Sequence, residues 1–363
     1  MTTLFDPITL REVTVRNRIW VPPLCQYSVI RRDGVPTDWH LAHLGSFAIG
    51  GAGLVLAEAT AVVPEGRISP HDTGIWNDAQ VEGWRRIVDF LHTQGATAGL
   101  QLAHAGRKAS VYPEWGFDTR GSIPLDSDDA GGGWQTVSAS PIAFEGYSAP
   151  RALTLDELPG IVDAFVAGAR RAIEAGFDLV ELHGAHGYLL HQFLSPLSNR
   201  RDDAYGGSLE NRARLLLEIV RAVRAELGDA VPILVRFSAS DYADGGWDAE
   251  QTAIVAGWAR DAGADFFDIS SGGLVSGVRI PLGPGYQVPF AAQVRSSADV
   301  AVSAVGLITE VAQAAAIVES GQADAVMLGR EMMRDPHFAL RAAHELGVEL
   351  GYWPPQYLRA RWS

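Results

Sequence analysis

Short, continuously apolar runs recur along the chain, and several of them follow a glycine. Segments with this plan are Gly50–Ala57, Ala175–Leu182, Ala262–Ile269 and Gly321–Leu328. Glycine suits the left-handed residue that ends a helix, and a short apolar run suits a parallel strand that is buried on both faces. Together with similar runs they predict eight strands: Arg18–Val21, Leu54–Ala57, Gly99–Leu102, Leu179–Leu182, Ile233–Phe237, Phe266–Ile269, Val300–Val305 and Ala325–Leu328.

Amphipathic helical patterns separate these strands. One helix is expected to begin after an N-cap at Ser208 and to end before Gly228, with its apolar residues on one face. Thr154 and Glu157 have the spacing of a capping box ahead of another helix. Eight alternating strand and helix units predict an α/β fold, the (β/α)8 TIM barrel. A doubly wound open sheet gives the same alternation and is the alternative that a strand count leaves open.

A long stretch after the third strand, residues 104–151, breaks this rhythm and is rich in Gly, Pro, Ser and Trp. Connections of this length are usually functional, so we expect an excursion or lid on the substrate side. The chain shows no interdomain linker and no low-complexity tract. A single domain is therefore expected to span residues 1–363.

Composition and charge narrow the possible partners. The 363 residues are 47% hydrophobic and carry a net charge of -14, which disfavours nucleic acids and anionic membranes as partners. No apolar run is long enough to span a membrane, and the N-terminus lacks the pattern of a signal peptide. The single cysteine, Cys25, excludes an intrachain disulfide and a cluster held by several thiolates, and a cytoplasmic location is expected.

The chemistry of a TIM barrel is expected where its strands end, because barrel active sites lie at the C-terminal face. After the last two strands, Gly306 and Gly329 allow close backbone approach and Arg330 can grip a phosphate. Thr309 is expected to begin a helix whose positive end faces the same anion. The alternative is a pair of tight turns beside a surface arginine.

Two histidines after the fourth strand, His183 and His186, have the spacing of metal ligands, and His191 lies nearby. A zinc site would need a third ligand with its own supporting contacts, and none is plainly placed. A histidine pair that donates hydrogen bonds to a carbonyl or phenolate oxygen is the better interpretation. The alternative for His183 and His186 is a purely structural role. The alternative for Cys25 is that it is a small buried apolar residue.

Longer motifs are spread along nearly the whole chain: Asn17-Arg18, Pro23-Leu-Cys-Gln-Tyr-Ser28, Glu58-Ala-Thr60, Gly66-Arg67, Gln101-Leu-Ala-His-Ala-Gly-Arg-Lys108, His183-Gly-Ala-His-Gly-Tyr188, Tyr205-Gly-Gly-Ser-Leu-Glu-Asn-Arg212, Pro284-Gly-Tyr-Gln287, Gly306-Leu-Ile-Thr309 and Gly329-Arg330. Through these motifs the chain resembles bacterial old yellow enzymes of the short, thermophilic-like subclass nearly end to end. Relatives often carry methionines around the cysteine, where this chain has Leu24 and Gln26.

The resemblance implies an FMN-dependent ene-reductase that uses NADPH or NADH. The residues implied to bind FMN are Pro22, Pro23, Leu24, Cys25, Ala59, Gln101, Arg236, Gly306, Gly329 and Arg330. Hydride is implied to pass from NAD(P)H to FMN and then to Cβ of an α,β-unsaturated carbonyl compound. His183 and His186 would hold the carbonyl oxygen, Tyr27 would contact the substrate, and Tyr188 would protonate Cα.

The resemblance also places the C-terminal tail, residues 351–363, at a subunit interface of a homodimer or homotetramer. Arg359 would enter the partner's active site, and Arg361 is the competing candidate. Other flavin barrels, such as amine demethylases or dienoyl-CoA reductases, are the nearer alternative; the single cysteine excludes their iron–sulfur versions. A non-redox phosphate-binding barrel would leave Cys25, Gln101 and Arg236 without a role. A non-catalytic flavoprotein would leave the histidine pair and Tyr188 without a role.

Overall fold

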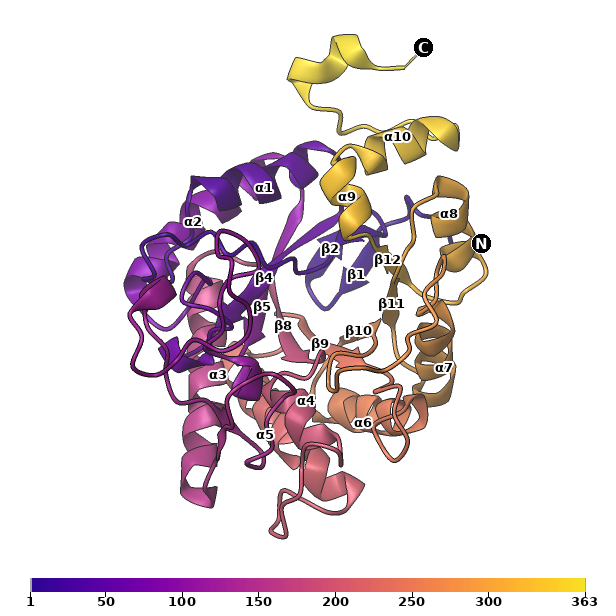
Figure 1. Ribbon diagram of the computed structural model, residues 1–363. Helices are drawn as coiled ribbons and strands as arrows, with labels where there is room; N and C mark the ends of the chain where they lie inside the picture. The colour runs from indigo at the N-terminus through magenta and orange to yellow at the C-terminus, as the bar shows by residue number, and fades with distance from the viewer. Residues whose placement is uncertain (1, 363) are drawn as a thin grey trace.

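A closed barrel of eight parallel strands forms the centre of the computed structural model, which describes residues 2–362 (Figure 1). The barrel strands in order are β3 (Ile19–Val21), β4 (Leu54–Ala61), β5 (Thr97–Ala103), β8 (Leu179–Gly184), β9 (Ile233–Ser238), β10 (Phe266–Ser270), β11 (Val302–Val305) and β12 (Ala325–Met327). The last strand pairs with the first through Val326 and Ile19. This closure confirms the predicted (β/α)8 barrel and excludes the open sheet.

Helices surround the barrel, as the alternating pattern predicted. They are α1 (Asp38–Ile49), α2 (Asp78–Thr93), α3 (Leu158–Glu174), α4 (Leu189–Leu194), α5 (Leu209–Leu227), α6 (Ala249–Ala262), α7 (Val288–Ala298), α8 (Val311–Glu319), α9 (Arg330–Arg334) and α10 (Phe338–Glu345). The Ser208 side chain caps α5 by accepting a hydrogen bond from the Asn211 amide, and the capping box of Thr154 and Glu157 is formed. No helix in residues 2–362 combines the length and apolar character of a membrane span.

The expected start of α8 at Thr309 is wrong. The helix begins at Val311, after an extended N-cap at Glu310. The Thr309 amide donates instead to the side chain of Gln313, which ties this residue into the turn ahead of the helix. Thr309 instead lies in the wall of a cavity at the C-terminal ends of the strands, and the first turn of the helix lies further along the chain.

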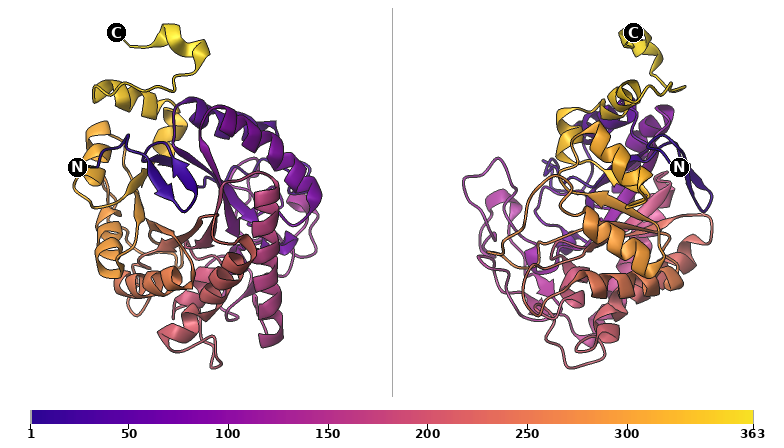
Figure 2. Two further views of the ribbon diagram at one scale, coloured as in Figure 1. Left: turned by 180° about the vertical axis from the view of Figure 1, so that it is seen from behind. Right: turned by 90° about the vertical axis from the view of Figure 1, so that its right-hand side faces the viewer.

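The barrel is sealed at the N-terminal ends of its strands by a hairpin that the sequence patterns did not predict. Its strands are β1 (Ile8–Leu10) and β2 (Val13–Val15). Leu10 and Val15 belong to the apolar cluster that fills the lower barrel, together with Trp20, Phe266 and Met327. Figure 2 shows the hairpin across this end of the barrel. Polar chemistry is thereby confined to the opposite end.

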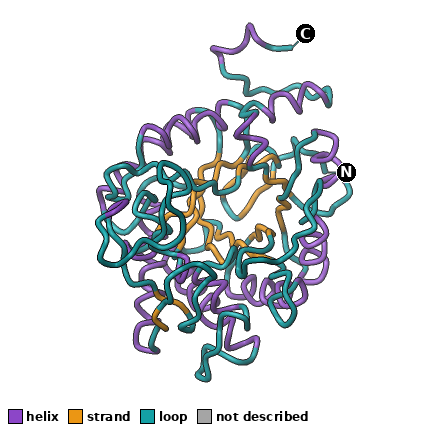
Figure 3. Tube along the Cα trace, in the orientation of Figure 1, coloured by secondary structure: helices purple, strands orange, loops and turns teal. Residues whose placement is uncertain are grey.

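The long connection after β5 is mostly irregular and lies over one side of the barrel (Figure 3). Its regular pieces are the 3-10 turns Gly106–Lys108 and Asp129–Gly131 and the strand β6 (Val137–Ser138), which pairs with β7 (Arg151–Ala152). Two tryptophans fasten it to neighbouring loops: Trp134 donates to the Glu65 carbonyl and Trp115 to the Gln26 carbonyl. These contacts hold the connection next to the segments that follow β3 and β4.

Candidate active site

A cavity of about 260 Å³ opens at the C-terminal ends of the strands. It brings together seven of the residues predicted to bind the cofactor: Pro22, Pro23, Leu24, Arg236, Gly306, Gly329 and Arg330. Ser270, Tyr286 and Gln287 also line the cavity, although the sequence analysis gave them no role. Ala59 lies outside this cavity, in a smaller one beside Tyr188.

Bare backbone forms part of the cavity wall. Gly306 has φ +117°, and a Cβ atom there would lie 2.7 Å from Nε2 of Gln287. A Cβ atom at Gly329 would lie 3.3 Å from the Leu24 side chain. With Arg330 at the same cavity, these glycines form a cradle in which a phosphate could meet both backbone amides and a guanidinium.

Polar side chains on neighbouring strands form a buried network below the cavity. Nε2 of Gln101 donates to Glu181 at 2.7 Å, and Nε of Arg236 lies 2.6 Å from the Asp268 carboxylate. Burial and the nearby Asp268 raise the pKa of Glu181, although Arg236 opposes this shift. Ser303 adds a hydrogen bond to Asp268 at 3.2 Å. The network orients a guanidinium and an amide, the donors that suit the electron-rich edge of a flavin ring.

Three rings gather at the end of β8. The ring centroid of His183 lies 5.2 Å from that of His186 and 5.0 Å from that of Tyr188. Burial and the positive charge of Arg236 lower the pKa of both histidines well below the ordinary value, so both are neutral near pH 7. Burial, reinforced by Cys25 and Asp72, raises the pKa of Tyr188 well above 10. The cluster therefore offers neutral histidines beside a phenol that keeps its proton.

Two of the predicted substrate-contacting residues have strained backbones. Tyr27 has φ +52° and His186 has φ +57°, in the left-handed region that non-glycine residues rarely occupy. Such strain persists only where surrounding contacts enforce it, and it is common at functional sites. His186 is also held through its side chain, because its Nε2 atom lies 2.7 Å from the Ser270 hydroxyl.

Cys25, Tyr27 and Tyr188 pack against one small apolar cluster, formed by Ile68, Ala105, Ala109 and Val111. Trp134 and Tyr147 of the long connection pack against the same cluster. Burial, together with the carboxylate of Glu58, raises the pKa of the Cys25 thiol well above its ordinary value. Cys25 is thus a neutral thiol, which is a poor nucleophile.

The structure does not assemble the histidines into a metal site. His191 is fully buried, and its Nε2 atom lies 3.1 Å from Asp241 rather than beside His183 and His186. Within residues 2–362, no group of three His, Cys, Asp or Glu side chains is arranged to hold a metal ion. The Nδ1 atom of His183 is buried and has no hydrogen-bond partner within the same residues. This atom is therefore free to bind a ligand.

The C-terminal tail lies away from the barrel mouth of its own chain (Figures 1 and 2). Arg359 is exposed on the 3-10 segment Pro355–Ala360. Arg361 stacks over the Trp353 ring at 5.6 Å. Neither arginine lines the strand-end cavity, so the fold does not bring either of them to the chain's own site.

A barrel mouth with a glycine and arginine cradle, a buried guanidinium and neutral hydrogen-bond donors has the features that a phosphate-bearing flavin cofactor would need. Residues 3–349 match the NADH:flavin oxidoreductase / NADH oxidase family, and the chain belongs to this family. FMN and a nicotinamide dinucleotide are accordingly the cofactors of this enzyme, in agreement with the donor set of the cavity.

Relatives with known names agree over almost the whole chain. The chain is 48% identical over 361 residues to an NADPH dehydrogenase of Listeria innocua, covering 99% of both proteins. It is 45% identical over 357 residues to an NADPH dehydrogenase of Bacillus subtilis, covering 98% of both. The solved structure of an old yellow enzyme homologue from Zymomonas mobilis is 30% identical with a TM-score of 0.78, covering 99% of this chain and 98% of that one.

Proposed function

We propose that this oxidoreductase is an FMN-dependent ene-reductase that oxidises NAD(P)H and reduces the activated C=C bond of α,β-unsaturated carbonyl compounds. The observation that carries the proposal is the ring cluster of His183, His186 and Tyr188 at the cavity end of β8. Two neutral donors suit a carbonyl oxygen, and an un-ionised phenol suits proton delivery to carbon.

Seven of the residues proposed to hold FMN line the strand-end cavity, whereas Ala59 lines the smaller cavity beside Tyr188 and Cys25 packs against the neighbouring apolar cluster. Gly306, Gly329 and Arg330 would hold the phosphate, and Pro22, Pro23, Leu24, Cys25 and Ala59 would contact the ring system. Gln101 and Arg236 would bind its polar edge. Bound FMN would supply the hydride-transfer chemistry between the nicotinamide and Cβ of the substrate.

The proposed catalytic work of the protein is to bind, orient and protonate. Negative charge develops on the substrate oxygen during reduction, and His183 and His186 would stabilise it with fixed donors in a site of low polarity. Tyr188 would give its proton to Cα, and Tyr27 would position the substrate. We further propose that the chain acts as one domain, with residues 104–151 serving as a lid that carries Trp134 and Tyr147 over the site.

The test of the proposed function is spectroscopic. The purified protein is expected to be yellow and to release intact FMN on denaturation. Under anaerobic conditions NADPH should bleach the flavin, and 2-cyclohexenone should restore the colour. A flavin that is bleached by NADPH but reoxidised only by another substrate class, such as an amine-derived imine, would contradict the ene-reductase proposal while leaving the family intact.

Cys25 is expected to tune the flavin rather than to act as a nucleophile, because its thiol is neutral and hydride transfer needs no covalent bond to the protein. Cys25→Ala should shift the flavin midpoint potential and the kinetic constants by a few-fold while turnover persists. A dye-coupled redox titration and steady-state kinetics would measure both effects, with Cys25→Ser as the polar control of similar size. Complete inactivation of a variant that retains FMN would contradict this role.

The tail is proposed to complete the site of a neighbouring subunit. Arg359 is exposed on a C-terminal tail that lies away from the barrel mouth of its own chain. A guanidinium is a permanent charge with a planar fork that can reach a substrate or flavin. A two-fold interface would make the exchange reciprocal. Arg359→Ala is expected to raise the Michaelis constant for the enone about tenfold without releasing FMN. Arg361→Ala is the matched variant, because Arg361 is stacked on Trp353.

Mixed dimers give a sharper test of the shared site. A subunit with Arg359→Ala, combined with one inactivated at His183 and His186, pairs one intact site with one intact tail. Activity per intact site should then recover in purified mixed dimers. A monomeric enzyme with full activity, or mixed dimers without recovery, would reject the shared site; a larger effect of Arg361→Ala would transfer the role to that residue.

A further inference from the structure

The backbone of the turn between His183 and Tyr188 is bound almost entirely by buried side chains. The His186 amide donates to the Ser238 hydroxyl at 2.9 Å, and its carbonyl accepts from Nζ of Lys108 at 3.0 Å. The Gly187 carbonyl accepts from Nε2 of Gln192 at 2.7 Å. The Gly187 amide donates to Nδ1 of His191 at 3.0 Å. All four polar backbone groups of His186 and Gly187 therefore have a side-chain partner.

This turn needs external support because two successive residues are left-handed. His186 has φ +57° and Gly187 has φ +72°. A Cβ atom at Gly187 would lie 2.3 Å from the Gly273 carbonyl oxygen, so the turn is packed directly on the segment after β10. A non-glycine residue in this conformation is strained, and the surrounding hydrogen bonds must offset that strain.

The contact from Gly187 selects one tautomer of the His191 ring. Because Nδ1 accepts the amide hydrogen bond, it carries no proton, and the single proton of the neutral ring must reside on Nε2. Nε2 lies 3.1 Å from an Asp241 oxygen, and both side chains are fully buried. A carboxylate facing Nε2 favours a proton on that atom. In the other tautomer the proton would be on Nδ1, where it would meet the hydrogen of the Gly187 amide.

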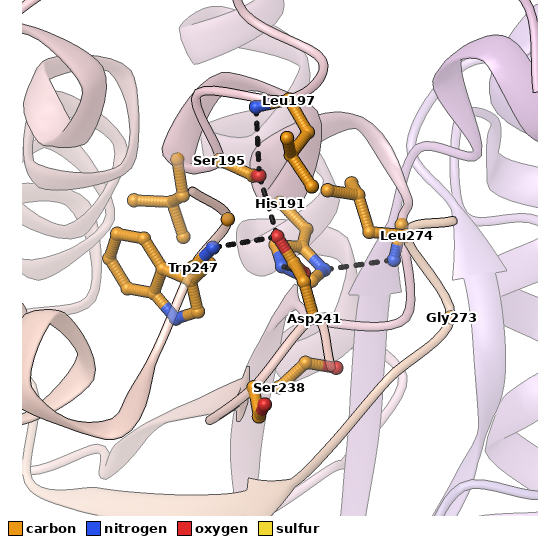
Figure 4. Close-up of polar contacts among 12 residues, drawn as sticks. His191, Ser195, Leu197, Ser238, Asp241, Trp247, Gly273 and Leu274 are labelled. Atoms are coloured by element: carbon orange, nitrogen blue, oxygen red, sulfur yellow. Dashed lines mark hydrogen bonds and ion pairs between the residues drawn. The ribbon is translucent and has the colours of Figure 1, made fainter. Parts of the chain in front are cut away.

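Asp241 is itself fixed by hydrogen bonds to its other oxygen. The Ser195 hydroxyl donates at 2.6 Å and the Trp247 amide at 2.8 Å, as the dashed lines in Figure 4 show. Burial alone would raise the pKa of Asp241, but His191 and these donors lower it below its ordinary value. The carboxylate therefore stays ionised, with its Oδ1 atom 3.1 Å from Nε2 of His191.

We infer that His191 and Asp241 are positioning residues for the reaction: together they lock the turn that aims His186 at the substrate and sets Tyr188 beside it. Neither residue needs to contact substrate or cofactor. The chain path from Gly187 leads directly into Tyr188, so a displaced Gly187 amide moves the proposed donor and the proposed acid at once. The inference rests on the proposed function for its catalytic meaning, but the locking of the turn can be measured without catalysis.

The expected consequence is a loss of catalytic geometry with retention of the cofactor. His191→Leu removes the acceptor for Gly187 and should lower enone reduction per bound flavin by about 10- to 100-fold, since small misplacements of reacting groups have effects of this size. It should also weaken binding of p-hydroxybenzaldehyde over the flavin, which depends on the histidine donors. His191→Asn places an amide oxygen near the former Nδ1 position and should recover part of both. The rate and phenol affinity of Asp241→Asn should lie between those of His191→Leu and His191→Asn. In either orientation, the new amide loses a contact to a neighbouring donor or no longer favours the His191 tautomer with its proton on Nε2.

The matched control is His92→Asn, which removes a histidine 2.9 Å from Asp178 at the opposite end of the barrel. It should leave the per-flavin rate and phenol affinity unchanged. A purely structural role for His191 would lower the melting temperature and the yield of His191→Leu while leaving those two quantities at the wild-type level, and that result would overturn the inference.

Hydrogen exchange separates this inference from the proposed function. The peptide spanning residues 184–190 should lose protection in His191→Leu and keep most of it in His191→Asn, whether or not the enzyme reduces enones. If the wild type binds FMN but reduces no enone, the proposed function fails while the locked turn is still tested. Unchanged exchange in His191→Leu would overturn the inference even in an active ene-reductase.

Discussion

His183→Ala and His186→Ala are each expected to slow enone reduction by about 10² to 10³-fold, the usual effect of removing one oxyanion donor. Both rings are neutral, and neither loses its donor capacity near pH 7, because burial and Arg236 hold their pKa values well below the ordinary range. Each substitution removes a donor that is fixed before the substrate arrives, so the loss should fall mainly on reoxidation of the flavin by enone.

The measurement is stopped-flow reoxidation with 2-cyclohexenone, paired with titration by p-hydroxybenzaldehyde. The phenol should produce a long-wavelength charge-transfer band in the wild type, and both alanine variants should weaken it. His186→Asn retains an N–H donor and should lose less than His186→Ala. Normal phenol binding and turnover in both alanine variants would make the histidines structural. Activity that follows added zinc would favour a metal site instead.

Tyr188→Phe is expected to lower the rate of reoxidation by enone by about 10² to 10⁴-fold, the range that general acid catalysis contributes. Reduction of the flavin by NADPH should change little, because that step requires no proton at carbon. Burial raises the pKa of the Tyr188 phenol well above 10, so the residue holds its proton across the neutral range. Ionisation of Tyr188 should therefore cause no loss of the wild-type reoxidation rate between about pH 6 and 9.

Tyr205→Phe is the matched control, because this phenol donates to Glu218 at 2.9 Å on the outside of the barrel. Removing that hydroxyl should leave both half-reactions unchanged. Equal slowing of both half-reactions in Tyr188→Phe would indicate a displaced nicotinamide or substrate rather than a lost proton donor. An unchanged rate of reoxidation by enone in Tyr188→Phe would show that another group provides the proton.

The barrel could be predicted because strands buried on both faces leave continuous apolar runs, such as Leu179–Leu182 and Phe266–Ile269. The hairpin of β1 and β2 left no such signal, since each strand has three residues and only one buried end. The start of α8 was misplaced because the Thr309 amide donates a hydrogen bond to the Gln313 side chain. Sequence periodicity does not reveal such a contact between a side chain and the backbone.

Much of the candidate site followed from reading the residues after each strand, which placed the phosphate cradle and the histidine pair at one mouth. Glu181 and Asp268 were overlooked, although a charged residue inside an apolar strand is itself a signal of a buried polar network. The spacing of His183, His186 and His191 could not show that His191 faces Asp241. The left-handed turn at His186 redirects the chain, and such a reversal is invisible to spacing alone.

The sole lysine of the chain, Lys108, has a practical consequence because its Nζ atom bridges the carbonyls of His186 and Gly273. Burial, with the nearby Arg107, lowers its pKa to about 8, so a large fraction of the amine is uncharged in mildly alkaline solution. An acylating reagent such as an N-hydroxysuccinimide ester can modify this amine only when the bridge opens. The rate of acylation at this one side chain, read by mass spectrometry, therefore reports how often the active-site turn opens.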